Sequence, residues 1–371
     1  KTPSPRACAL AIAILLAGCT SPPAGHAPAA DAAPPPSTYW RAADPATQGA
    51  ACRAVLDDLH ARVRAQPTTA MMAVRGDRVV FTEGPVAQAS QIASACKSLL
   101  AMLYGRPVAD GRIHLDATLA DLGIDDIGGL LPLERTARVR DLLAARSGVY
   151  HPAANGGDDA DAAPPRGSRP PGTYFLYNNW DFNALGDIYE QRTGRDLYDA
   201  FADEIATPLG LEDWHREREH RSGDTSRSIH RAYYFHLSAR DMARIGELVL
   251  ADGRWDGRQL VPADWARTIT APVTHAADMH PARRARHAIG YGLLWWVPEP
   301  PAGSPLAPAL AGSAMAWGYY GQWILVMPAR GMVVVHKFDT RARPDDAVQP
   351  RTLPVETFLR EAVELADAPC A

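Results

Sequence analysis

The tetrapeptide Ser94-Ala95-Cys96-Lys97 carries two side chains that can act together as nucleophile and base. After it, apolar residues recur at helical spacing, so we expect a buried helix that begins near Ser94. Residues three apart on a helix share a face, which places the Ser94 hydroxyl beside the Lys97 amine. A serine hydroxyl becomes a good nucleophile when a base takes its proton, and a buried lysine that is uncharged can be that base.

Lysine is scarce in this chain. Only Lys1, Lys97 and Lys337 are lysines among the 38 basic residues. Arginine suffices wherever only a positive charge is needed, but it does not lose its proton in a protein, so a base must be lysine. The alternative is a surface lysine beside a serine, Ser94, that caps the helix.

The segment Tyr177-Asn178-Asn179 offers a second set of polar groups. The Tyr177 phenol, if it lies beside Lys97, can shuttle a proton between Ser94 and a leaving group. Asn179 has both a donor and an acceptor with which to orient Lys97 and a substrate carbonyl. In the structural alternative, Tyr177 is a core aromatic residue and Asn179 caps a helix.

These motifs, taken in order, resemble the class C β-lactamases and their esterase, amidase and 6-aminohexanoate-dimer hydrolase relatives. The resemblance covers roughly residues 50 to 368 and is carried by 94–97, 139–143, 177–179, 207–211 and 239–246. It implies a two-step acyl transfer in which Ser94 forms an acyl-enzyme and Lys97 with Tyr177 acts as the general base. No metal ion and no organic cofactor is expected.

The family's third motif, Lys-Thr-Gly or His-x-Gly, falls on Ala316-Trp317-Gly318. Gly318 suits a strand position at which a substrate approaches the backbone closely. The resemblance implies that the backbone N–H groups of Ser94 and Tyr319 form an oxyanion hole. Ala316 supplies neither the cation nor the imidazole that helps penicillin-active members hold a carboxylate. We therefore expect a small ester, amide or peptide-like substrate.

Two other functions remain open on the sequence alone. One is a β-lactamase or D,D-peptidase that acts on β-lactams or cell-wall peptides. The other is a catalytically silent envelope lipoprotein that binds a ligand with the same fold. A net charge of -4 without a dense Lys/Arg run gives no basic footprint for nucleic acid.

The elements that must position these residues lie at both ends of the chain. Two hairpins are indicated by paired apolar runs, at 71–74 with 79–81 and at 323–327 with 332–335. The second hairpin is apolar throughout, which indicates burial on both faces. Helical periodicity flanks them, at 51–64 and at 353–365.

Between these ends, helical stretches dominate and no good strand pairs appear; the stretches are 139–145, 182–192, 197–205 and 239–250. We therefore predict an α+β fold, in which an antiparallel sheet built from both chain ends carries terminal helices and a mainly helical insertion. The sheet part comprises 46–105 and 286–371, the helical part comprises 106–285, and the site lies in the crevice between them.

The N-terminal segment is expected to stay outside this fold. A positive start, a short apolar run from Ala7 to Leu16 and small residues before Cys19 resemble a bacterial lipoprotein signal. Residues 1–18 would be removed and Cys19 lipidated, with a plain secretory signal as the alternative. Thr20 implies an outer-membrane lipoprotein that faces the periplasm of a Gram-negative bacterium. Residues 19–45, rich in Pro and Ala, would form a tether, and 46–371 the hydrolase domain.

The states expected of the other cysteines depend on the predicted export of the chain. Cys52 and Cys370 lie near the two ends of the folded region, and folding is expected in an oxidising compartment. They can form a disulfide if the terminal helices pack antiparallel, and two unpaired thiols are the alternative. Cys96 lies on the apolar face of the predicted helix, where we expect a buried, inert thiol.

Overall fold

The computed structural model describes residues 39–42, 49–157, 159–339, 341 and 352–370. The predicted signal peptide, residues 1–18, and the lipidation site Cys19 lie outside the described residues, so both stay predictions. Among the helices of the described ranges, none combines the length and the apolar character needed to cross a membrane.

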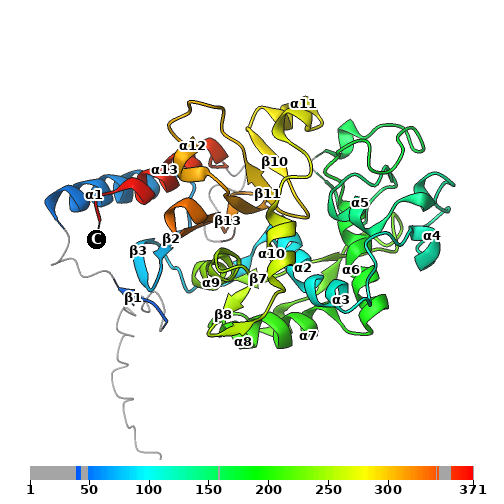
Figure 1. Ribbon diagram of the computed structural model, residues 1–371, viewed down its shortest axis with the longest axis horizontal. Helices are drawn as coiled ribbons and strands as arrows, with labels where there is room; N and C mark the ends of the chain where they lie inside the picture. Colours follow the sequence, from blue (N-terminus) through cyan, green and yellow to red (C-terminus); the bar gives the residue numbers. More distant parts are fainter. Residues whose placement is uncertain (1–38, 43–48, 158, 340, 342–351, 371) are drawn as a thin grey trace, which may run out of the picture. The chain divides into compact units, whose positions relative to one another are not determined.

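An eight-stranded sheet forms the centre of the fold, in the order β1-β3-β2-β14-β13-β12-β11-β10 (Figure 1). β2 pairs antiparallel with β14, which joins the two ends of the chain. The antiparallel sheet and its flanking helices confirm the predicted α+β class. The strands of this sheet are β1 (Arg41–Ala42), β2 (Ala70–Arg75), β3 (Arg78–Glu83), β10 (Ile289–Tyr291), β11 (Trp296–Pro298), β12 (Ala314–Gly318), β13 (Gln322–Met327) and β14 (Met332–Lys337).

Helices cover both faces of this sheet. Neighbouring residues of β13 point to opposite faces, as strand geometry requires. Trp323 stacks on Phe358 of α13 with ring centroids 4.7 Å apart. On the other face, a Cβ at Gly246 of α9 would lie only 2.9 Å from a side-chain carbon of Ile324. Burial on both faces explains why the terminal hairpin is apolar throughout, and it confirms that prediction.

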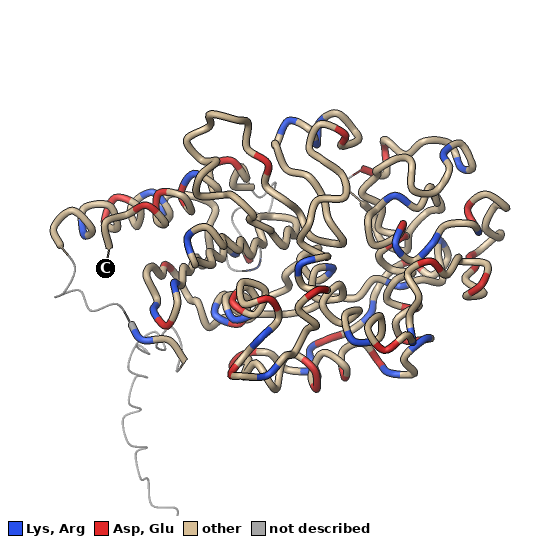
Figure 2. Tube along the Cα trace, viewed as in Figure 1, with Lys and Arg blue, Asp and Glu red and all other residues tan. Residues whose placement is uncertain are grey.

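The described α-helices number thirteen, and α1 and α13 lie side by side (Figure 1). Figure 2 shows charged residues of both signs interspersed along α1 and over the helical region. The helices are α1 (Ala50–Ala65), α2 (Cys96–Leu103), α3 (Gly105–Ala109), α4 (Leu119–Leu122), α5 (Val139–Leu143), α6 (Asn179–Thr193), α7 (Leu197–Phe201), α8 (Thr207–Leu209), α9 (Ala239–Leu250), α10 (Ala263–Thr270), α11 (Ala282–Ala285), α12 (Ala307–Leu310) and α13 (Val355–Asp367).

A disulfide between Cys52 and Cys370 closes the two ends of the fold. The bond joins α1 to the residues after α13. The predicted disulfide is thus confirmed, and the alternative of two unpaired thiols at these positions is excluded. Cys96 is buried and unpaired, and desolvation raises the pKa of its thiol to about 11. This supports the predicted inert thiol, because the reactive form is the thiolate.

The predicted end of the tether, at residue 45, is wrong. Trp40 is only 4% exposed, and its indole Nε1 donates a hydrogen bond of 2.8 Å to Glu247 of α9. Arg41 and Ala42 pair with Arg78 and Val79 as a parallel edge strand. The ordered fold therefore reaches back at least to Trp40, because burying a large indole favours docking of this segment.

The predicted helical part, 106–285, also differs from the structure in two respects. Its helix α9 packs against β13, β14 and β2, so it belongs to the sheet layer. It also contains short strand pairs, which we did not expect. These are β5 (Arg221–Ser222) with β6 (Ala232–Tyr233) and β8 (Arg254–Trp255) with β9 (Arg258–Gln259), while β7 (His236–Leu237) pairs with β4 (Ser90–Gln91). Strands of two residues are too short to show an alternating pattern.

Candidate active site

Ser94 lies in a 3₁₀ turn, η1 (Ala93–Ala95), which leads directly into α2. The chain before it is held by the β4–β7 pair and by a hydrogen bond from the Ile92 amide to the Phe235 carbonyl. Ala93 has a positive φ of 46°, which is uncommon for a residue with a side chain. The anchored segment thus sustains a strained residue immediately before Ser94.

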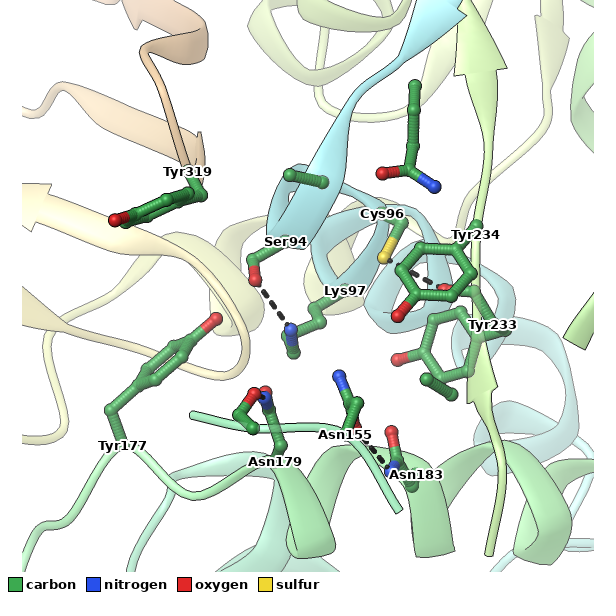
Figure 3. Close-up of a pocket in the computed structure, with 14 residues that line it drawn as sticks. Ser94, Cys96, Lys97, Asn155, Tyr177, Asn179, Asn183, Tyr233, Tyr234 and Tyr319 are labelled. Carbon is green, nitrogen blue, oxygen red and sulfur yellow. Dashed lines mark hydrogen bonds between the residues drawn. The ribbon is translucent and has the colours of Figure 1, made fainter. Parts of the chain in front are cut away.

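The Ser94 and Lys97 side chains meet, as the helical spacing predicts. The Lys97 Nζ lies 2.7 Å from the Ser94 hydroxyl oxygen, which is hydrogen-bond distance (Figure 3). Lys97 is only 7% exposed, and its Nζ lies 5.4 Å from the ring centre of Tyr177 and 5.2 Å from that of Phe182. The alternative of a surface lysine is therefore excluded.

Tyr177 is both a core residue and a residue of the site. Its side chain is buried, and its hydroxyl points toward Ser94 and Lys97 (Figure 3). The ring stacks on Trp296 with centroids 5.4 Å apart and meets Tyr291 edge-on at 6.3 Å. The ring thus packs against aromatic neighbours while its hydroxyl end points toward the serine.

Asn179 begins α6, but the preceding Asn178 caps the helix, because its side chain accepts a hydrogen bond from the Trp180 amide. The side-chain nitrogen of Asn179 donates a hydrogen bond to the Gly156 carbonyl. This bond fixes which end of the side-chain amide is the nitrogen and which is the oxygen. Its carbonyl oxygen is buried and has no hydrogen-bond partner among the described residues. The expected orientation of Lys97 by Asn179 is thus not made through a hydrogen bond of that oxygen.

Gly318 ends β12 against the turn that carries Ser94. A Cβ at this position would lie 2.2 Å from the Ile92 carbonyl oxygen and 3.1 Å from the Ala95 amide nitrogen. The close approach that we expected from a substrate is therefore made by the chain's own backbone. Tyr319 follows at the rim of the cavity. Among the hydrogen bonds of the described residues, the amides of Ser94 and Tyr319 donate to no backbone carbonyl.

A cavity of about 280 Å³ opens above Ser94. Most of its lining residues have polar side chains, and Lys97 is the one charged side chain among the described residues that line it. Sequence reasoning missed most of the wall. Asn183 carried a signal, because it lies one helical turn after Asn179, whereas nothing in the sequence linked Tyr233 to Ser94. The cavity is lined by Gln91, Ala93, Ser94, Cys96, Lys97, Asn155, Gly156, Tyr177, Asn179, Asn183, Ala232, Tyr233, Tyr234 and Tyr319.

An ion-pair cluster packs behind Tyr177. The Asp159 side chain is fully buried and accepts hydrogen bonds of 2.9 Å from both Arg283 and Arg284. The Arg284 guanidinium lies 5.5 Å from the ring centre of Tyr177 and 5.4 Å from that of Trp296. Asp159 therefore takes part in the packing around the site.

Lys337, the last residue of β14, is a second buried lysine. It is 2% exposed, and its ammonium donates to the Leu237 carbonyl and lies 3.4 Å from the Ser90 carbonyl oxygen. Desolvation lowers the pKa of Lys337 to about 7, although the charge of Asp339 acts in the opposite direction. This lysine ties β14 to the β4–β7 pair that precedes Ser94.

We predict that Lys337 makes stability depend on pH above neutrality. Its pKa is near 7 in the folded state and about 10.4 when unfolded. Between these values the unfolded chain binds more protons, so the free energy of unfolding rises with pH. Below pH 7, Lys337 is protonated in both the folded and the unfolded state, so the full cost of burying its charge lowers the free energy of unfolding. Urea unfolding of wild type should show a gain of about 2 kcal/mol from pH 7 to pH 9 that Lys337→Met lacks; equal gains in both proteins would contradict the assignment.

The fold places the chain in a class, the hydrolases with the β-lactamase/transpeptidase-like fold. A family model described as Beta-lactamase matches residues 55–353. The chain therefore belongs to the Beta-lactamase family. A search of curated proteins gave no significant match.

Solved structures support the fold. The chain is similar to a protein from Bacillus anthracis assigned as a 6-aminohexanoate-dimer hydrolase, with 22% identity, a TM-score of 0.59, and coverage of 85% of this chain and 81% of that one. A penicillin-binding protein homolog from Caulobacter crescentus has 16% identity, a TM-score of 0.56, and coverages of 78% and 92%. A mutant of simvastatin synthase from Aspergillus terreus has 16% identity, a TM-score of 0.61, and coverages of 87% and 98%.

Proposed function

We propose that this protein is a serine hydrolase that cleaves an ester or amide through an acyl-enzyme on Ser94. The observation that carries the proposal is the 2.7 Å contact between the Lys97 amine and the Ser94 hydroxyl on the floor of a cavity. Burial disfavours the charged form of a lysine. The uncharged form has a free electron pair on its nitrogen, and this pair can accept the proton of Ser94. A hydroxyl with a base at hydrogen-bond distance is the signature of an activated nucleophile.

In the first step, Lys97, coupled to Tyr177, takes the proton of Ser94. The Ser94 oxygen bonds to the substrate carbonyl carbon, and the carbonyl oxygen becomes an oxyanion. The amides of Ser94 and Tyr319 are its proposed donors, and both are without a backbone acceptor in the described chain. The bond to the leaving group then breaks, and the leaving oxygen or nitrogen takes a proton from Lys97 or Tyr177.

In the second step, water replaces the leaving group. The same base system takes a proton from the water, whose oxygen bonds to the acyl carbon. The bond between this carbon and the Ser94 oxygen breaks, and Ser94 regains its proton. The products are a carboxylic acid and the free enzyme. The family triplet carries alanine, Ala316, which is buried and supplies no charge for a substrate carboxylate, and this favours esters and amides over β-lactams.

Covalent labelling with a fluorophosphonate tests the nucleophile. We expect one label per chain on wild type, at Ser94, and none on Ser94→Ala. Ser98→Ala is the matched control. Ser98 lies one turn further along α2, and its hydroxyl donates to the Leu294 carbonyl at 2.7 Å, so this variant should still be labelled.

A panel of esters, amides and a fluorescent penicillin then identifies the reaction. Turnover of an ester or amide that disappears in Ser94→Ala supports the proposal. Stoichiometric penicillin labelling with turnover would instead establish the β-lactamase or D,D-peptidase alternative. A folded wild-type protein that never reacts with the fluorophosphonate would leave the silent binding protein as the function.

A further inference from the structure

The hydroxyl of Tyr233 is buried in the cavity wall without a hydrogen-bond partner among the described residues. Tyr233 is 3% exposed, and its side chain points toward the side of the cavity where Asn155 and Lys97 are drawn (Figure 3). A buried polar group without a partner is costly, so each one calls for an explanation, and a ligand atom is one where the group lines a cavity. The side-chain oxygen of Asn179 is a second such atom in the same cavity.

The surrounding chain holds this phenol in place. Tyr233 ends β6, where it pairs with Arg221, and its backbone carbonyl accepts a hydrogen bond of 3.3 Å from the Cys96 thiol. Its ring packs on Gly186 of α6, where a Cβ would lie 3.1 Å from the nearest ring carbon. The backbone of Tyr233 is thus tied to α2 and its ring lies against α6.

The polar side chains of Asn155, Asn183 and Tyr234, which also line the cavity, have hydrogen-bond partners of their own. Asn183 donates to Asn155 at 2.9 Å and to the His230 carbonyl at 3.2 Å. Asn155 also interacts with the Tyr234 hydroxyl. Desolvation holds the pKa of Tyr233 well above its usual value, so its phenol keeps its proton and can donate. The wall thus presents one buried donor that its own network does not use.

The charges that line the cavity limit which substrate groups can bind the Tyr233 hydroxyl. Among the described lining residues only Lys97 carries charge, and the proposed reaction needs its amine for Ser94. No carboxylate lines this described wall to receive an ammonium group, and no further cation lines it to receive a carboxylate. An uncharged oxygen, such as that of a ketone, an ether or an amide, fits the phenol without such a penalty.

We propose that Tyr233 is a specificity-determining residue that selects acyl groups with an uncharged hydrogen-bond acceptor over purely aliphatic acyl groups. The inference rests on the proposed function, because it assumes that the acyl group of a Ser94 ester occupies this cavity. A site built to hydrogen-bond a substrate atom discriminates against an analogue that lacks the atom, since the protein group is then left unpaired.

Two pairs of p-nitrophenyl esters of matched shape test this inference. The first pair is methoxyacetate and butyrate, and the second is 4-oxopentanoate and 4-methylpentanoate. The ratio of kcat/KM within each pair is measured for wild type and for Tyr233→Phe, so that the intrinsic reactivity of the esters cancels. In at least one pair we expect the preference for the acceptor ester to fall about tenfold in the variant, with the aliphatic member little changed.

Tyr150→Phe is the matched control. Its hydroxyl is also buried without a partner among the described residues, but it lines a neighbouring cavity rather than that of Ser94. This variant should keep the wild-type ratios. Tyr233→Phe loses only an unpartnered hydroxyl, so it should fold, and titration with the fluorophosphonate would verify that all of its sites react.

The outcomes separate the two proposals. If wild type and Tyr233→Phe give the same ratios for both pairs while Ser94-dependent turnover persists, the role of Tyr233 is overturned and the proposed function stands. An equal effect of Tyr150→Phe would also overturn it, because the acyl group would then lie in the other cavity. Absence of Ser94-dependent turnover of all four esters would overturn the role of Tyr233. The proposed function would fall with it only if the fluorophosphonate also failed to label Ser94.

Discussion

Replacement of Lys97 by arginine is expected to lower kcat/KM by about 10³-fold, although the positive charge is kept. A general base contributes about 10²–10⁴-fold to a rate, and a guanidinium cannot accept a proton from Ser94. Lys97→Met should have a similar effect, because methionine fills nearly the same volume without a basic group. Steady-state kinetics with the best ester of the panel measures both variants.

The two variants distinguish a base from a fixed charge. If Lys97 only stabilised negative charge, arginine would restore most of the activity that methionine loses. An arginine variant with more than a tenth of the wild-type kcat/KM would therefore contradict the assignment of Lys97 as base. Thermal unfolding is the control for folding, since the side chain lies buried against Tyr177 and Phe182. Labelling by the fluorophosphonate should slow together with turnover in both variants.

Gly318→Ala is expected to lower kcat by about 10²-fold through a single added methyl group. The new Cβ would lie 2.2 Å from the Ile92 carbonyl oxygen and 2.8 Å from the Gln322 Cβ, so backbone has to move. Either η1 shifts, which displaces the Ser94 hydroxyl and amide, or the end of β12 shifts, which displaces the Tyr319 amide. A displacement of about 1 Å at a reacting group can cost about 10²-fold in rate.

Stability should also fall, by about 1–3 kcal/mol, because extra volume in a packed interior is destabilising. Gly49→Ala is the matched control, since no atom of the described residues lies within 4 Å of a Cβ at that position and its φ is -64°. Urea unfolding and ester turnover should show both losses for position 318. Position 49, which is the N-cap of α1, should show a smaller loss of stability and normal turnover. Normal turnover by Gly318→Ala would mean that the contact between β12 and η1 does not position the nucleophile.

The elements near the nucleophile could be predicted because their information is local. The spacing of Ser94 and Lys97 places them on one helical face, and this geometry requires nothing beyond the periodicity of the helix. The terminal hairpin from β13 to β14 and its burial on both faces follow equally from a continuous apolar pattern around a turn. The disulfide was one of two open outcomes, because spacing in sequence does not set the distance between Cys52 and Cys370.

The tertiary structure alone decided which distant segments face Ser94. Tyr233 reaches the cavity from a strand of two residues, and Arg284 reaches the ring of Tyr177 through a buried pair with Asp159. The residues in each contact are far apart in the chain and follow no regular spacing, so no sequence pattern predicts that they meet. Local geometry was thus enough to predict the contact of Ser94 with Lys97 and the sheet that carries them. The walls of the cavity, the partner of Gly318 and the docking of Trp40 depend on packing between segments far apart in the chain, which only the folded structure sets.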